Sequence, residues 1–236
     1  MSARDRPPAP IVALDYPDAD RALALVEELG PRCRFYKVGS ELFTAAGPAV
    51  VTRLRSAGCE VMLDLKFHDI PNTVAGAVAS ASALGARILT VHATGGEEML
   101  RAAAGAAGDC EVFAVTILTS MDAPAISAAW GREPVEATRE VVRLATVARA
   151  AGVPGVVASG SDVAAIKGAL GADFKVLVPG VRPAGSSAGD QRRVVTPGEA
   201  ARLGADYVVI GRAVTAATDH RRAMEQIIEE LGTPAN

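Results

Sequence analysis

The sequence has few cysteines and no long run of basic residues, and both absences exclude classes of protein. Its 236 residues include three cysteines, Cys33, Cys59 and Cys110, which form no CxxC or Cys/His ligand spacing. This usage is typical of a reduced cytosolic protein, so we expect a cytoplasmic location. The formal net charge is −3, and without a basic run it argues against a nucleic-acid partner.

Long apolar runs are also missing, so we expect no segment that spans a membrane. The first ten residues, MSARDRPPAP, lack the apolar region of a secretory signal. We expect residues 1–10 to form a flexible tail and residues 11–232 to form one domain. Half of the residues are apolar, which is enough to build one large core in a chain of this length.

Short apolar runs alternate with Ala-rich helical patterns along the whole chain. The predicted strands cover residues 11–14, 35–38, 61–65, 88–91, 111–118, 155–158, 175–178 and 207–210. The predicted helices cover residues 18–29, 48–57, 71–84, 97–107, 136–151, 161–170, 197–203 and 213–231. Six of these helices are followed by a glycine of the kind that ends a helix, at positions 30, 58, 85, 152, 171 and 204.

Eight strand–helix units in a chain of this size favour a single-domain α/β fold, the closed (β/α)8 or TIM barrel. An open, doubly wound parallel sheet is the alternative that this pattern leaves. Two connections are long, over residues 119–136 and 179–195. Long connections in a compact domain usually have a function or are mobile.

Nearly every predicted strand ends in a polar or charged residue. In chain order these residues are Asp15, Lys37, Asp64 with Lys66, His92, Thr119 with Ser120, Ser159, Arg182 and Arg212. The active-site groups of a barrel come from the carboxyl ends of its strands and the loops that follow. The sequence therefore predicts a functional site at that end. We assign no catalytic role to His92, because a neutral histidine can be hydrogen-bonded there for structural reasons.

The segment LDLKFHDIPNT, residues 63–73, carries the densest group of charges. Side chains alternate along a strand, so Asp64 and Lys66 share one face, while Leu63 and Leu65 take the other. We expect the two leucines to pack against the helix layer and the two charged side chains to line the barrel mouth. The structural alternative is a surface ion pair between Asp64 and Lys66.

The same segment predicts the start of the next helix. Proline is favoured at the first helical position, so Pro71 places Asp69 or Ile70 at the helix entry. Asp69 is then either a helix-capping carboxylate or, like Asp64 and Lys66, part of a charged site.

A second group of residues lies in the segments VPGVRP, GDQRR and VIGRAV. Barrels often hold a phosphate in the loops after strands seven and eight, against the start of a helix. Gly211 allows the backbone to approach a ligand, and Arg212 offers donors suited to phosphate oxygens. Arg182 and Gln191 could reach the same anion. The alternative is a solvated glycine-rich loop with incidental arginines.

DLKFHDIPNT, VHATGG, VTILTS, VPGVRP, GDQRRVVTP and VIGRAV together resemble the bacterial type of the orotidine 5′-phosphate decarboxylase family. The resemblance extends from Ile11 to the last helix. The pattern DxKxxD also occurs in related sugar-phosphate decarboxylases and synthases, so the IPNT continuation and the GDQRR loop discriminate between them.

The resemblance implies a homodimeric barrel that converts orotidine 5′-monophosphate to UMP and CO2, the last step of de novo pyrimidine biosynthesis. It implies no metal and no organic cofactor, with Lys66 protonating a carbanion at C6. The residues implied as catalytic are Lys37, Asp64, Lys66 and Asp69. Those implied to contact substrate are Asp15 and Lys37 at the ribose, Thr119 and Ser120 at the pyrimidine, and Arg182, Gln191 and Arg212 at the phosphate. Gly211, which precedes Arg212, stays a predicted substrate-binding residue because it allows the backbone to approach a ligand. Those implied to reach the partner's site are Asp69, Ile70 and Thr73.

Two other functions stay open at this point. One is a magnesium-dependent sugar-phosphate decarboxylase or hexulose-phosphate synthase on the same scaffold, and the other is a non-catalytic phosphosugar-binding protein. The Gly- and Ser-rich segment 183–193 is expected to close over the phosphate as a lid.

Overall fold

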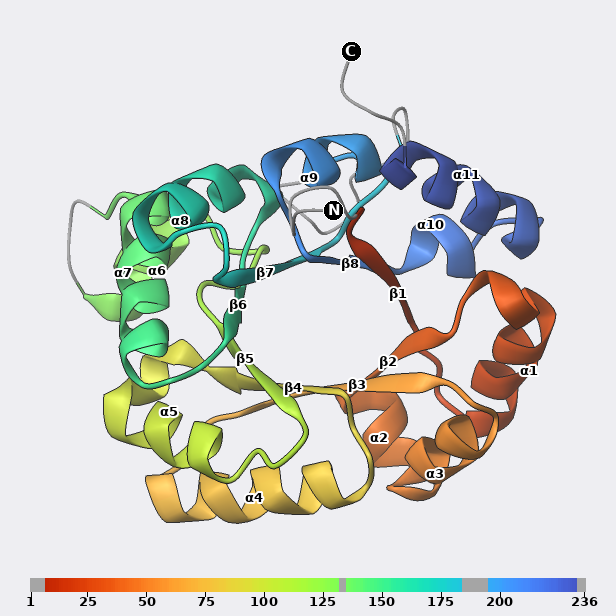
Figure 1. Ribbon diagram of the computed structural model, residues 1–236, viewed down its shortest axis with the longest axis horizontal. Helices are drawn as coiled ribbons and strands as arrows, with labels where there is room; N and C mark the ends of the chain where they lie inside the picture. Colours follow the sequence, from red (N-terminus) through yellow and green to blue (C-terminus); the bar gives the residue numbers. More distant parts are fainter. Residues whose placement is uncertain (1–6, 132–134, 184–194, 233–236) are drawn as a thin grey trace.

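Eight parallel strands, each paired with its neighbours in sequence order, close into a barrel in the computed structural model (Figure 1). The structure describes residues 7–131, 135–183 and 195–232. The strands are β1 (Ala9–Ala13), β2 (Phe35–Gly39), β3 (Glu60–Phe67), β4 (Ile88–His92), β5 (Glu111–Val115), β6 (Gly155–Val157), β7 (Lys175–Pro179) and β8 (Tyr207–Ile210). Pairing of β1 with β8 completes the ring. The predicted barrel is therefore confirmed, and the open-sheet alternative is wrong.

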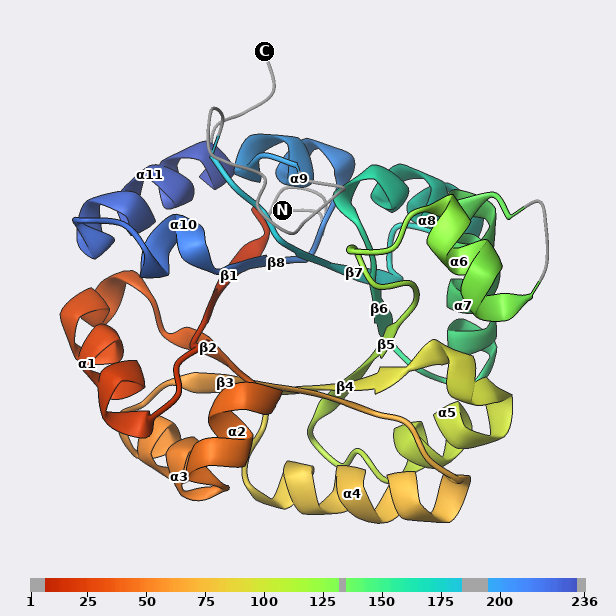
Figure 2. The same cartoon turned by 180° about the vertical axis from the view of Figure 1, so that it is seen from behind.

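Helices surround the ring of strands in both views (Figures 1 and 2). They are α1 (Ala19–Leu29), α2 (Ser40–Ala46), α3 (Ala49–Ser56), α4 (Pro71–Ala83), α5 (Gly96–Gly105), α6 (Ala123–Trp130), α7 (Ala137–Ala150), α8 (Val163–Leu170), α9 (Pro197–Leu203), α10 (Arg212–Thr215) and α11 (His220–Gly232). Short 3-10 turns occupy Gly30–Arg32, Ala93–Gly95 and Gly160–Asp162. Among the described residues, no helix is long and apolar enough to cross a membrane.

The observed elements differ from the predicted ones in a few places. The strand predicted over 111–118 ends at Val115, and β1 already begins at Ala9, inside the segment expected to be a tail. The helix predicted over 213–231 is two helices, because the carboxylate of Asp219 accepts a hydrogen bond from the Arg222 amide and starts α11 anew.

Two short helices were not predicted. Helix α2 follows β2 directly, and α6 lies inside the connection expected over residues 119–136. A local signal for α6 was present, because the carboxylate of Asp122 caps it by accepting from the Ala125 amide and Pro124 lies in its first turn.

The apolar residues form two separate clusters. The larger one lies between the strands and the helices and contains the outward-facing residues of every strand, such as Val12, Val38 and Leu63. The smaller one fills the barrel interior with inward-facing residues, including Phe35, Phe113 and Leu177. All six predicted helix-ending glycines have positive φ, from 54° to 89°, so each strand follows its helix after a short turn as expected.

Candidate active site

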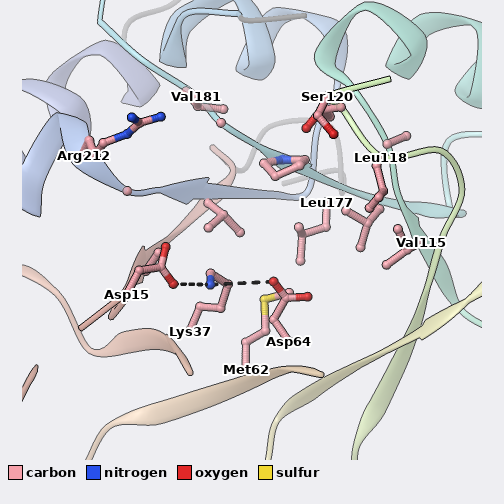
Figure 3. Close-up of a pocket in the computed structure, with 18 of the residues that line it drawn as sticks. Asp15, Lys37, Met62, Asp64, Val115, Leu118, Ser120, Leu177, Val181 and Arg212 are labelled. Atoms are coloured by element: carbon pink, nitrogen blue, oxygen red, sulfur yellow. Dashed lines mark hydrogen bonds and ion pairs between the residues drawn. The ribbon is translucent and has the colours of Figure 1, made fainter. Parts of the chain in front are cut away.

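A cavity of about 560 Å3 opens at the carboxyl ends of the strands, within the size range of small-molecule sites. Figure 3 shows Asp15, Lys37 and Asp64 in a row, with Arg212 and Ser120 elsewhere on the cavity wall. Nine of the predicted residues line it: Asp15, Lys37, Asp64, Lys66, Thr119, Ser120, Arg182, Gly211 and Arg212. The fold thus brings together residues separated by nearly two hundred positions in the sequence.

Four of these side chains form a row of alternating charge. The Lys37 ammonium donates to Asp15, with Nζ 2.8 Å from Oδ1, and lies 3.7 Å from Oδ2 of Asp64. The Lys66 ammonium donates to Oδ1 of Asp64 at 2.7 Å. The order along the wall is therefore Asp15, Lys37, Asp64 and Lys66, called here the charged row.

Asp64 is the best-protected anion of the charged row. Its side chain is 15 % exposed, whereas that of Asp15, the other anion, is 56 % exposed. The Lys66 side chain is 33 % exposed and accessible from the cavity. Burial alone would raise the pKa of Asp64, but Lys37 and Lys66, with hydrogen bonds from Lys66 and Thr90, lower that pKa below its usual value. Asp64 is therefore a carboxylate at neutral pH and holds both ammonium groups in place.

The side chains of β3 alternate as the sequence predicts. Leu63 belongs to the cluster under the helices and Leu65 packs against it, while Met62, Asp64 and Lys66 line the cavity. The prediction that the charged pair faces the barrel mouth is confirmed. The two side chains do form an ion pair, but this pair lines the cavity.

The backbone of β3 is irregular where it carries the charged row. Its register against β4 shifts between Leu63 and Phe67, and Lys66 has a φ of 51°, the only positive φ among the described non-glycine residues. This left-handed conformation costs free energy for a residue with a Cβ, and such strain is concentrated at functional sites.

Gly39, at the end of β2, provides space for the charged row. A Cβ added to Gly39 would lie 2.9 Å from Nζ of Lys37 and 3.3 Å from Oδ1 of Asp15. Any larger residue would have to displace the Lys37–Asp15 ion pair. Sequence reasoning missed Gly39, and the only available signal was a glycine two positions after the lysine.

Three predicted residues lie outside this cavity within the single chain. Asp69 and Thr73 are exposed, and Ile70 is 66 % exposed. The Asp69 carboxylate accepts a hydrogen bond from the Ile70 amide at 2.6 Å. The prediction that Asp69 or Ile70 stands at the helix entry is confirmed, with Ile70 at the position before Pro71 and no side-chain cap.

Arg182 and Arg212 contribute positive charge to the same cavity, from the loop after β7 and the start of α10. Burial and the neighbouring Arg212 lower the pKa of Arg182, so the two guanidinium groups are close enough to repel each other. A Cβ on Gly211 would meet no atom within 4 Å, so the backbone is open there. Gln191 and the predicted lid, apart from Pro183, lie outside the described residues.

Thr119 and Ser120 follow β5 and line the cavity next to Leu118, which is one of the few exposed large apolar residues described. They supply hydroxyl groups beside an apolar floor that includes Met62, Val115 and Leu177. Such a surface suits a planar ring with polar edges.

His92 ends β4 beside the charged row and is not among the described cavity-lining residues. Its ring centroid is 5.5 Å from that of His68. Burial, His68 and Lys66 lower the pKa of His92, so this histidine is neutral at physiological pH. The described residues include no group of three or more His, Cys, Asp or Glu side chains arranged to hold a metal ion.

A family model, related sequences and a solved structure all relate this chain to the same protein family. A family model described as "Orotidine 5'-phosphate decarboxylase / HUMPS family" matches residues 8–227. The orotidine 5′-phosphate decarboxylase of Moorella thermoacetica is 49 % identical over 98 % of this chain and 94 % of that protein. That of Sodalis glossinidius is 50 % identical over 94 % of this chain and 89 % of that protein. The crystal structure of the Lactobacillus acidophilus enzyme of the same name superposes with a TM-score of 0.85 at 34 % identity, covering 97 % of this chain and all of that one.

Proposed function

Because the chain belongs to the orotidine 5′-phosphate decarboxylase family, we propose that it converts orotidine 5′-monophosphate to UMP and CO2. It is an enzyme of the carboxy-lyase class, and the proposed substrate places it at the last step of de novo pyrimidine biosynthesis. The observation that carries the proposal is the charged row, with Lys66 accessible from a cavity that also contains two arginines.

The two arginines suit the phosphate of the nucleotide. Guanidinium groups bind phosphate oxygens through several donors at once, and the open backbone at Gly211 leaves room for the anion. The pyrimidine then lies toward Thr119, Ser120 and the charged row. Binding energy from the phosphate, which does not react, holds the reacting part of the substrate in place.

The reaction needs a positively charged group of the protein next to the ring carbon that loses CO2, because that carbon develops negative charge. When the bond from C6 to the carboxylate breaks, its electron pair stays in an sp² orbital that the ring cannot delocalise. In the proposed mechanism the Lys66 ammonium attracts this developing lone pair and then transfers its proton to C6, which gives UMP. Solvent afterwards reprotonates Lys66. Two unit charges about 4 Å apart interact by roughly 4 kcal/mol at an effective dielectric constant of 20, which corresponds to a large rate effect.

Asp64 has two roles in this proposal. Its carboxylate positions the ammonium groups of Lys37 and Lys66, at 3.7 and 2.7 Å. It also repels the substrate carboxylate if the two lie side by side, and departure of CO2 relieves that repulsion. We propose that fixed charges supply the stabilisation and that neither a metal nor an organic cofactor takes part.

Mixing the purified protein with orotidine 5′-monophosphate and following the loss of its ultraviolet absorbance tests the proposed activity. We expect turnover in wild type, no effect of a metal chelator, and a loss of turnover in Lys66→Ala. If the protein does not decarboxylate this substrate but shows an activity on sugar phosphates that a chelator abolishes, a magnesium-dependent synthase or sugar-phosphate decarboxylase is favoured instead. Binding of phosphosugars without turnover would indicate a non-catalytic protein.

We also propose a homodimer whose active sites are shared. Asp69, Ile70 and Thr73 are exposed and outside the cavity of their own chain, where they could reach a partner's site. They lie at the start of α4, a helix without a charged residue whose exposed face is made of small side chains. A surface of this kind is suited to burial against a second copy.

Subunit mixing tests this arrangement. Lys66→Ala and Asp69→Ala should each be inactive alone, because each removes a group from every site. A mixed dimer has one site with both groups intact, so random exchange should restore about a quarter of wild-type activity. Mixing Lys66→Ala with the double variant Lys66→Ala/Asp69→Ala is the matched control and should restore nothing. Absence of recovery in the first mixture, with exchange verified by mass, would exclude shared sites.

A cytoplasmic location is the last part of the proposal. Cys33, Cys59 and Cys110 are all buried and free, as expected for a protein that folds under reducing conditions. Fractionation of cells with an antibody against the protein checks it.

A further inference from the structure

Thr90 is a fully buried polar residue in the middle of β4, an otherwise apolar strand up to His92. Its hydroxyl makes two hydrogen bonds, and both connect to the charged row. Oγ1 accepts from the backbone amide of Lys66 at 3.0 Å and donates to Oδ1 of Asp64 at 3.0 Å. Thr90 itself is not among the described residues that line the cavity.

The register of the two strands explains why a hydroxyl is needed here. Leu63 pairs with Leu89 and Phe67 pairs with Val91, so three residues of β3, from Asp64 to Lys66, lie opposite Thr90 alone. A bulge of this kind removes backbone groups from the regular ladder. Lys66 has a left-handed φ of 51° in this bulge, and its backbone amide donates to the Thr90 side chain instead of to a backbone carbonyl of the ladder.

We propose that Thr90 is a positioning residue for the decarboxylation, acting through its hydroxyl on both Asp64 and Lys66. This inference rests on the proposed function, because it deepens the role of the same site. One hydroxyl bridges the backbone of the proton donor and the carboxylate that holds the donor's ammonium. It therefore couples the strained backbone at Lys66 to the 2.7 Å ion pair between Lys66 and Asp64.

Removing the hydroxyl leaves two buried groups without a partner. The Lys66 amide would lose its acceptor and Asp64 would lose one donor, and such buried groups are costly to leave unpaired. The bulge can then relax toward a regular strand, which turns the Lys66 side chain away from its position. Because the cavity wall is otherwise unchanged, the effect falls on the chemical step rather than on nucleotide binding.

The central experiment compares Thr90→Val, which keeps the shape and removes the hydroxyl, with Thr90→Ser, which keeps the hydroxyl. We expect kcat of Thr90→Val to fall by about 10- to 100-fold, the effect of losing a hydrogen bond to a charged group. KM and the affinity for UMP should stay within about threefold, and Thr90→Ser should recover most of kcat.

Thr116→Val is the matched control. Thr116 is a buried threonine that follows β5, and its hydroxyl donates to the carbonyl of Val157 at 2.9 Å, a group that is not part of the charged row. It should lose thermal stability to an extent similar to that of Thr90→Val and keep kcat within about twofold. Equal losses of kcat in both valine variants would mean that Thr90 has only a structural role and would overturn the proposal.

A second readout does not depend on turnover. Thr90 donates to the Asp64 carboxylate and favours its charged form, so the pKa of Asp64, followed by 13C NMR of its side chain, should rise in Thr90→Val but not in Thr116→Val. An unchanged pKa together with an unchanged kcat overturns the positioning role. If wild type itself does not decarboxylate the nucleotide, the proposed function fails, while the NMR comparison still decides whether Thr90 controls the charged row.

Discussion

Two charged clusters, one at each end of the barrel, have nearly the same local chemistry and different surroundings. At the carboxyl end, Asp64 contacts Lys37 and Lys66, at 3.7 and 2.7 Å. At the amino end, Glu111 contacts Arg87 and Lys175, at 2.7 and 2.5 Å. The side chains of both central carboxylates are 15 % exposed.

The difference lies in the packing beside each carboxylate. Next to Glu111, the Tyr207 ring forms T-shaped pairs with the rings of Phe113 and Phe35, with centroids 5.6 and 6.2 Å apart, and these rings fill the barrel. Next to Asp64 the inward-facing residues are smaller or flexible, and no aromatic ring is among the described residues that line the cavity. An ion pair alone therefore does not identify an active site, whereas an ion pair that faces a cavity of nucleotide size does.

Lys66→Ala is the change that should separate the two clusters most strongly. Because it removes the proposed proton donor and the cation nearest to Asp64, we expect kcat to fall by at least about 10⁴-fold. Lys175→Ala, which removes a lysine paired to the other central carboxylate, is the matched control and should leave kcat within about threefold. Absorbance assays at saturating substrate check both, and normal turnover by Lys66→Ala would remove this residue from the mechanism.

Arg212→Ala should have the next largest effect, and it tests the phosphate side of the same cavity. We expect KM for the nucleotide to rise by about 10²-fold, because charge-assisted bonds to phosphate are lost. The rate with orotidine, which lacks the phosphate, should hardly change. Equal losses with both substrates would contradict the proposal that Arg212 binds the phosphate.

Glu111→Gln should mainly affect folding. The change leaves Arg87 and Lys175 without their shared anion, so we expect the free energy of unfolding to fall by about 2 kcal/mol. The midpoint of thermal unfolding should fall by roughly 5 °C, while kcat per folded molecule is unchanged. A large loss of kcat with a normal melting curve would show that the amino-end cluster also serves catalysis.

The smallest expected effect concerns acid stability. Burial acts to raise the pKa of Asp64, but Lys37 and Lys66, with hydrogen bonds from Lys66 and Thr90, together bring it below its ordinary value of 3.8 in the folded protein. The stabilisation from this carboxylate is therefore complete above that value and is lost as the pH falls below it. Denaturant unfolding between about pH 5 and pH 2, at about one-unit steps, should show a weaker acid dependence in Asp64→Asn than in wild type.

Much of the fold and part of the site followed from local patterns. Alternation along β3 was sufficient to place Asp64 and Lys66 on the inner face, and the glycines after six helices marked the turns into the next strands. The split between α10 and α11 was missed, because helical periodicity continues through a break that depends on one capping carboxylate, that of Asp219.

Thr90 and Gly39 were missed for a different reason. A single threonine in an apolar strand carries no signal, since its partners, Asp64 and Lys66, belong to another strand. Gly39 matters only because the ion pair between Lys37 and Asp15 lies where a Cβ of residue 39 would be. Such contacts depend on register between strands, which local periodicity does not specify.

By itself the amino-acid sequence determined the alternation of strands and helices, the inward direction of the charged residues on β3, and the chemical types available at the strand ends. These follow from nearest-neighbour backbone geometry, which each segment carries with it. Only the tertiary structure decided which charges meet, where the barrel is filled by rings and where it is open, and how one hydroxyl of β4 supports a strained lysine of β3. Closure of the ring brings side chains from distant segments within hydrogen-bonding distance, and that proximity has no counterpart along the chain.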